Sequence, residues 1–158
     1  MSLDAPNLVG AVNAKGFKIG IVVSRFNQDI TDKLLNSALA ALTEHGADQQ
    51  SIVVVHVPGA LEIATVAAKL AQRGIDALIC LGCVIRGGTA HFDYVCATTM
   101  QAIGNLAARG DIAVGNGVLT LDSIIQAQER VGGTHGDKGR EAALVAIEIA
   151  QTLKRLSA

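Results

Sequence analysis

The sequence predicts a single α/β domain built on a doubly wound, parallel sheet of four strands flanked by helices. Apolar runs and amphipathic segments alternate four times along the chain. The apolar runs show no regular polar alternation, which is typical of strands buried on both faces of a parallel sheet. At 158 residues the chain is long enough for one complete hydrophobic core, and we find no repeat, linker or low-complexity segment.

Four apolar runs are expected to form the strands. The first is continuous and rich in β-branched residues, which favour extended backbone. The second ends at Pro58 and Gly59, and the third leads into a glycine-rich segment. The predicted strands are residues 17–23, 51–57, 77–84 and 112–119.

Amphipathic segments that follow the first three strands predict the first three helices. Asp29 is expected to cap the first helix, which Gly46 ends. The second helix runs from about Ala60 to Gly74, and the third follows His91.

The C-terminal part of the chain predicts one short helix and one long helix. Ser123 and Gln126 have the spacing of a capping box for a short helix that ends at Arg130. A glycine-rich loop, residues 132–136, then leads to a last helix after Asp137. The apolar stripe of this helix is expected to comprise Ala142, Val145, Ala146, Ile149, Leu153 and Leu156.

Composition excludes several classes of function. Half of the residues are hydrophobic but only 3% are aromatic, so the core must be aliphatic. A net charge of −1 without a basic run argues against a nucleic-acid partner. No apolar run approaches the ~18 residues that span a membrane, and no signal peptide is recognisable. Three cysteines without metal-ligand spacing indicate reduced core residues of a cytoplasmic protein.

The segment 82–95, GCVIRGGTAHFDYV, carries the strongest functional signal. It reads as the end of a buried strand, a glycine loop and the start of a helix. Helix N-termini bind anions, and Arg86 adds a planar cation suited to phosphate. His91 adds a group of the type that exchanges protons near neutral pH. We therefore expect an anion site beside an acid–base residue.

Ligands of open α/β sheets bind beyond the carboxyl ends of the strands. This rule brings four segments together: residues 25–27, 60–62, 86–91 and 120–122. A planar polar substrate would stack on Phe26, and Glu62 would accept hydrogen bonds from it. Each residue also has a structural interpretation. Phe26 fits a core position, Glu62 a helix-dipole partner, His91 a plain helix start, and arginines are often solvated.

Two nucleotide motifs need to be considered against this interpretation. Residues 82–89 spell G-x-x-x-x-G-G-T, which lacks the lysine of the P-loop. No strand end offers a clear magnesium-binding aspartate, and G-x-G-x-x-G is absent. Hydrolysis of a nucleoside triphosphate and dinucleotide binding are therefore disfavoured.

Several blocks of the sequence resemble the 6,7-dimethyl-8-ribityllumazine synthase family. The resemblance runs from about Phe17 to the C-terminus, and the block that ends in His91-Phe92 is its most specific part. Three positions depart from the family pattern: Asn116 replaces a common Phe, Ala64 a common Pro, and Asp137 a common Asn. The matching blocks are PGALE (58–62), GCVIRGGTAHF (82–92), GVLT (117–120), QAxxR (126–130) and DKGxEAA (137–143).

The resemblance implies a flavodoxin-like fold and a transferase of riboflavin biosynthesis. Members condense 5-amino-6-(D-ribitylamino)uracil with 3,4-dihydroxy-2-butanone 4-phosphate, without a cofactor or metal, and release phosphate and water. His91 matches the proton donor, and Gly88, Thr89 and Arg130 match the site of the butanone phosphate. The residues implied for the pyrimidine and ribityl parts are Phe26, Ala60, Leu61, Glu62, Cys83, Val84, Ile85 and, from a neighbouring subunit, Asn116.

The resemblance also implies an assembly. By its own composition, the segment 1–15 is either a loose arm or a strand that needs a partner. The resemblance implies that residues 1–16 form an arm whose strand, within residues 7–12, adds to the sheet of a neighbouring subunit, and that residues 17–158 form the catalytic domain. Such chains form pentamers. The absence of an insertion between Arg130 and Lys138 favours a sixty-subunit icosahedral shell, with riboflavin synthase as a further partner. Two competing functions are a flavin- or lumazine-binding module without catalysis and an archaeal-type riboflavin synthase.

Overall fold

The computed structural model describes residues 7–157 and confirms the predicted α/β class. Its sheet has four parallel strands: β1 (Ile19–Ser24), β2 (Ile52–Val57), β3 (Ala77–Ile85) and β4 (Ala113–Leu121). The strands lie in the order β2-β1-β3-β4, with Ile19 opposite both Ile52 and Ala77, and Ala77 opposite Ala113. The third and fourth predicted strands were too short, because β3 and β4 extend to residues 85 and 121.

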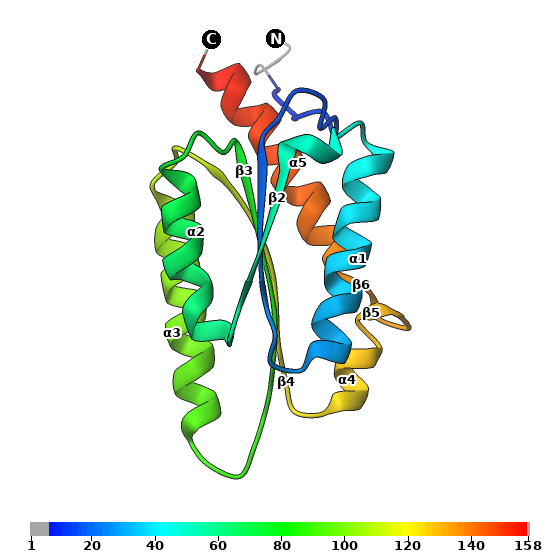
Figure 1. Ribbon diagram of the computed structural model, residues 1–158, viewed down its shortest axis with the longest axis vertical. Helices are drawn as coiled ribbons and strands as arrows, with labels where there is room; N and C mark the ends of the chain where they lie inside the picture. Colours follow the sequence, from blue (N-terminus) through cyan, green and yellow to red (C-terminus); the bar gives the residue numbers. More distant parts are fainter. Residues whose placement is uncertain (1–6, 158) are drawn as a thin grey trace, which may run out of the picture.

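Helices cover both faces of the sheet (Figure 1). One face carries α2 (Ile63–Ala71) and α3 (His91–Ala108), and the other carries α1 (Gln28–Glu44) and α5 (Lys138–Leu156). Short 3-10 helices, Gln49–Ser51 and Ala60–Glu62, precede β2 and α2. All strands point away from the end of the molecule where both termini lie, so their carboxyl ends share one edge (Figure 1).

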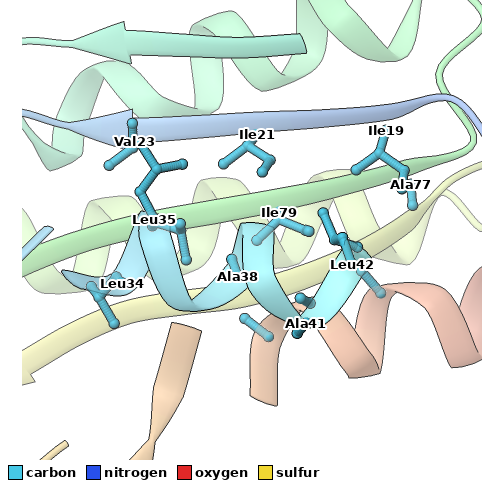
Figure 2. Packing of buried hydrophobic residues seen from close by; sticks show 14 of the residues in the cluster. Ile19, Ile21, Val23, Leu34, Leu35, Ala38, Ala41, Leu42, Ala77 and Ile79 are labelled. Atoms are coloured by element: carbon cyan, nitrogen blue, oxygen red, sulfur yellow. The ribbon is translucent and has the colours of Figure 1, made fainter. Parts of the chain in front are cut away.

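Two aliphatic clusters sandwich the central strands. On the α1 face, Leu35 and Ala38 lie in one buried cluster with Ile21 and Ile79 (Figure 2). On the opposite face, residues of α2 and α3 pack against β1, β3 and β4. β1 is buried throughout, whereas β2 and β4 are edge strands with exposed positions. The expectation of burial on both faces therefore holds for the central strands and is wrong for the edges.

The start of α1 differs from the prediction. Asn27, not Asp29, occupies the N-cap position, and its backbone is left-handed with φ of 58°. Asp29 lies within the first turn, where its negative charge interacts favourably with the helix dipole. Asparagine tolerates the left-handed conformation better than other non-glycine residues, so the chain turns sharply from β1 into α1 at this position.

The predicted glycine loop, residues 132–136, is a small hairpin instead. β5 (Val131–Gly133) pairs with β6 (Gly136–Asp137) in antiparallel orientation, after the short helix α4 (Ile124–Gln128). The capping box of α4 is confirmed: Ser123 Oγ accepts from the N–H of Gln126 at 3.3 Å. The Asp137 carboxylate caps α5 by accepting from the N–H of Arg140 at 3.2 Å.

The predicted apolar stripe of α5 is partly wrong. Val145, Ile149 and Leu156 are 49%, 41% and 69% exposed. The buried face consists of Gly139, Ala142, Ala143, Ala146, Ile147 and Ala150. The helix lies so close to its neighbours that a Cβ at position 139 would collide with the carbonyl oxygen of Leu34. Close backbone approach therefore requires glycine at position 139, and alanines make up most of the remaining buried face.

The N-terminal segment forms no strand within residues 7–14. Instead it lies along α5, where Gln151 Nε2 donates to the carbonyl of Asn13 at 2.6 Å and Arg155 Nη1 to that of Val9 at 3.3 Å. Residues 1–6 of the predicted arm lie outside the described part of the chain. In residues 7–157, no helix combines the length and apolar character needed to cross a bilayer.

Candidate active site

A pocket of about 330 Å³ lies at the carboxyl edge of the sheet, where the predicted segments meet. The segment after β1 contributes Phe26, the segment after β2 contributes residues 59–62, and β3 ends in its floor. The loop after β3 and the first turns of α3 complete the wall. Its volume lies within the range of small-molecule sites, roughly 300–1,000 Å³.

Phe26 is a pocket residue and not a core residue, because 71% of its surface is exposed. Main-chain bonds fix its position: the N–H of Phe26 donates to the carbonyl of Pro58 at 3.1 Å, and that of Arg25 to Val57 at 2.8 Å. These bonds continue the pairing of β1 with β2 beyond the sheet. An aromatic ring at a rigid pocket edge suits stacking on a planar substrate.

Glu62 both stabilises the start of a helix and lines the pocket. One carboxylate oxygen, Oε2, accepts from the N–H of Gly59 at 2.9 Å and so stabilises the helix start. The same side chain lines the pocket, together with Ala60 and Leu61. The carboxylate is therefore held in a fixed orientation, and its other oxygen can accept hydrogen bonds from substrate hydroxyl groups.

Cys83, Val84 and Ile85 at the end of β3 form the apolar part of the pocket. Burial raises the pKa of the Cys83 thiol to about 11. The thiol is therefore neutral at physiological pH, and Cys83 contributes shape and apolar surface instead of a nucleophile. Cys80, Cys83 and Cys96 are all free thiols, and burial raises the pKa of Cys80 to about 12.

His91 is the first residue of α3 and lines the pocket on the side of the glycine loop. Its main-chain N–H lies 3.4 Å from Thr89 Oγ1, which also lines the pocket. His91 is exposed, so substrate and water both reach its ring. An imidazole in this place can donate or accept protons on a substrate that stacks on Phe26.

Three predicted site residues do not line this pocket within one chain. Arg130 lies in a separate hollow of about 420 Å³, where its Nη1 donates to the carbonyl of Gln126 at 2.9 Å. Asn116 lies in a third hollow beside α5, and Gly88 sits in the exposed loop, outside the lining. The pocket of a single chain therefore contains most of the predicted site residues, but not Gly88, Asn116 or Arg130.

The structure gives two residues contacts that the sequence did not predict. Asn27 Nδ2 donates to the carbonyl of Cys83 at 2.9 Å and so ties the Phe26 turn to the pocket floor. Arg86, expected to bind an anion, instead contacts two carboxylates, those of Asp122 and Asp93. The hydrogen bond to Asp122 is the main cause that raises the pKa of Arg86 above its usual value. The sequence carries no local signal for either contact.

Comparison with known proteins agrees with this geometry. The 6,7-dimethyl-8-ribityllumazine synthase family matches residues 16–154. The chain belongs to this family. A curated relative, the 6,7-dimethyl-8-ribityllumazine synthase of Clostridium kluyveri, is 47% identical over 148 residues, which cover 93% of this chain and 96% of the relative. The match includes every segment of the pocket, and the resemblance inferred from the motifs is confirmed.

Proposed function

We propose that the pocket at the carboxyl edge condenses 5-amino-6-(D-ribitylamino)uracil with 3,4-dihydroxy-2-butanone 4-phosphate. The product is 6,7-dimethyl-8-ribityllumazine, the penultimate compound of riboflavin biosynthesis. Family membership supports this function as a transferase. The main support for this site is that Phe26, Glu62 and His91 lie in one pocket, although they come from different parts of the chain.

The residues suggest a division of roles. Phe26 stacks on the pyrimidine, which Cys83, Val84 and Ile85 enclose, while Ala60, Leu61 and Glu62 hold the ribityl chain. The glycine loop, with Gly88 and Thr89, binds the phosphate of the butanone. These roles follow the resemblance residue by residue, and the lining of the pocket supports all of them except that of Gly88.

The reaction needs proton transfer and proximity but no protein nucleophile. The amine of the uracil attacks the butanone carbonyl, and loss of water gives an imine. Phosphate then leaves, and a second amine–carbonyl condensation closes the ring. His91 is placed to donate protons to the departing groups. Holding both substrates in one pocket supplies the larger part of the rate enhancement.

A second subunit completes the site in this proposal. Arg130 and Asn116 lie outside the pocket of their own chain, so they would complete the pocket of a neighbour. The exposed apolar side chains of Val145 and Ile149 on α5 are suited to burial between subunits. The proposed assembly is a pentamer with an N-terminal strand, within residues 7–12, added to the neighbouring sheet.

The finer points of the assembly extend the same proposal. The short connection between Arg130 and Lys138 favours a sixty-subunit shell over a lone pentamer. Riboflavin synthase, which consumes the product, is the proposed protein partner, and the cytoplasm is the proposed location. Residues 1–16 act as the arm, and residues 17–158 as the catalytic domain.

One assay separates this function from the two competing ones. The purified protein is mixed with the uracil and the butanone phosphate, and lumazine absorbance and fluorescence are followed. A binding module produces no lumazine but retains added lumazine in equilibrium dialysis. A riboflavin synthase converts added lumazine to riboflavin without the butanone phosphate. Lumazine formation that requires both substrates supports the proposal, and either other result contradicts it.

A further inference from the structure

One arginine connects the loop after β3 with two other elements. Arg86 Nε donates to Asp122 Oδ1 at 2.8 Å, at the end of β4. Its Nη1 donates to Asp93 Oδ1 at 3.3 Å, in the first turn of α3. The guanidinium carbon also lies 4.4 Å from the centroid of the Phe92 ring. The planar head of Arg86 is therefore held by two carboxylates and an aromatic face.

These contacts lie around the segment that presents His91. Arg86 precedes the glycine loop, and Asp93 follows His91, so their ion pair closes residues 87–92 into a loop with fixed ends. Phe92 lines both the His91 pocket and the hollow that contains Arg86, so the guanidinium supports the pocket wall from behind.

The loop has few other attachments. A Cβ at Gly87 or Gly88 would meet no atom within 4 Å. Among the described residues, the side chain of Thr89 forms a hydrogen bond only with the N–H of His91. Apart from bonds to α3, the hydrogen bonds that tie residues 86–90 to other elements in the described chain come from Arg86. Its main-chain N–H donates to the carbonyl of Leu121 at 2.8 Å, and its side chain contacts Asp122.

We propose that Arg86 is a positioning residue that holds the glycine loop closed and keeps His91 at the pocket, and that it does not bind the substrate phosphate. The proposal rests on the proposed function of the His91 pocket. A phosphate that reached the guanidinium would have to displace Asp122 or Asp93 and then face both negative charges. Arg86 also lies outside the lining of the pocket that contains His91.

The geometry requires arginine specifically. Its planar fork reaches two carboxylates while one face stays on the Phe92 ring, whereas a lysine presents a single point charge. The side chains of Arg86, Asp93 and Asp122 are 47%, 60% and 68% exposed. Ion pairs this exposed contribute little to the free energy of unfolding. The variants should therefore remain folded and show their effect in turnover.

The first experiment measures steady-state kinetics of Arg86→Gln and Arg86→Lys. A catalytic group displaced by about 1 Å can cost on the order of 100-fold in rate, so we expect a roughly tenfold fall in kcat for Arg86→Gln. KM for both substrates should stay within about twofold, and Arg86→Lys should restore little. The matched control is Arg109→Gln, whose guanidinium is equally exposed and pairs with Asp111 at 2.6 Å, and its kinetics should equal those of the wild type.

The second experiment removes a partner and leaves Arg86 in place. Asp122→Asn frees the guanidinium, so a phosphate-binding Arg86 would lower KM for the butanone phosphate. A positioning Arg86 instead predicts a fall in kcat, with the Arg86→Gln/Asp122→Asn double variant no slower than Arg86→Gln alone. If Arg86→Gln does not assemble, the same fall in kcat can be measured in Asp122→Asn and Asp93→Asn, which leave Arg86 in place.

Amide hydrogen exchange supplies a readout that does not depend on activity. Exchange in residues 87–92 should become faster in Arg86→Gln, while the centre of α3 stays unchanged. If the wild type makes no lumazine, the proposed function fails, and the exchange data still decide whether Arg86 holds the loop. If the wild type is active, an unchanged kcat in Arg86→Gln overturns the proposal. A rise in KM for the butanone phosphate alone overturns it in favour of a phosphate ligand.

Discussion

Asn27 and Cys83, far apart in the sequence, are joined by a hydrogen bond of 2.9 Å from the Asn27 side-chain amide to the Cys83 carbonyl. Asn27 is the one non-glycine residue of the described chain with a positive φ. Strained backbone of this kind persists where its surroundings fix it, often beside a functional site. The bond fixes the turn that carries Phe26 against the pocket floor.

Asn27→Ala should therefore weaken both the fold and the pocket. Loss of one hydrogen bond and a left-handed alanine should together lower the free energy of unfolding by about 2 kcal/mol. Asn27→Gly is the control, because glycine adopts this φ freely and loses only the hydrogen bond. Urea unfolding at a fixed protein concentration measures both, and equal stability of the two variants would contradict the strain argument.

His91→Ala should slow turnover and leave substrate binding largely intact. His91 is exposed and lines the pocket, and in the proposed function it transfers protons while other residues hold the substrates together. We expect a loss on the order of 10- to 100-fold in kcat. His45→Gln, at the opposite edge of the sheet, serves as the control. A His91→Ala enzyme with wild-type kcat would remove His91 from the mechanism.

Arg130→Ala should weaken the phosphorylated ketone far more than the uracil. A charge-assisted hydrogen bond contributes roughly 1.5–3 kcal/mol, so the dissociation constant of the ketone should rise about tenfold or more. Calorimetry with each substrate alone measures the effect. Equal weakening of both substrates would exclude a phosphate-specific role.

Mixing two impaired variants tests whether sites are shared between subunits. His91→Ala and Arg130→Ala subunits, unfolded and refolded together, should form some interfaces with both residues intact. At a low concentration of the ketone, the mixture should then be more active than either variant refolded alone. If Arg130 instead serves its own chain, no mixed interface contains a complete site, and the mixture should be no more active than the average of the two variants.

Removal of residues 1–15 should loosen the assembly and lower activity together. The expectation follows from an apolar segment, residues 7–12, that pairs with no strand in residues 7–157 and would add to a neighbour. Light scattering at neutral pH reports the size of the assembly, with the full chain as control. A truncated protein that stays pentameric and fully active would show that the segment only lies along its own α5. For the full chain, a monomer or dimer would contradict the pentamer itself.

Stability should fall at alkaline pH because of the buried thiols. Burial raises the pKa of Cys80 to about 12 from an ordinary value of 9.0, which we take for the unfolded chain. Between these values the unfolded chain binds fewer protons than the native protein, so the free energy of unfolding decreases as pH rises and is unaffected below about pH 9. Urea unfolding between pH 8 and about 11 should show this slope, and it should be shallower in Cys80→Ala.

Local sequence pattern was enough to predict some of the site residues at the sheet edge, but not where the others lie. Phe26, Glu62 and His91 each follow a predicted strand, and the parallel topology carries them to one edge. Arg130 and Asn116 came from resemblance to a family, and one chain places them outside the pocket. No pattern within one sequence could show this, because the separation depends on how β4 and α4 pack against the rest.

By itself, the sequence determined the order of strands and helices, the carboxyl-edge site and the family, because these depend on apolar periodicity and on contiguous motifs. Tertiary structure decided which face of α5 is buried, because the backbone of Leu34 lies so close to the helix that position 139 admits only glycine. It also decided which groups Arg86 contacts, since Asp122 reaches it only through the neighbouring strand β4. Both contacts join residues that are far apart in the sequence. Their strength depends on the distance between the two groups in the folded chain, which the sequence around either group does not reveal.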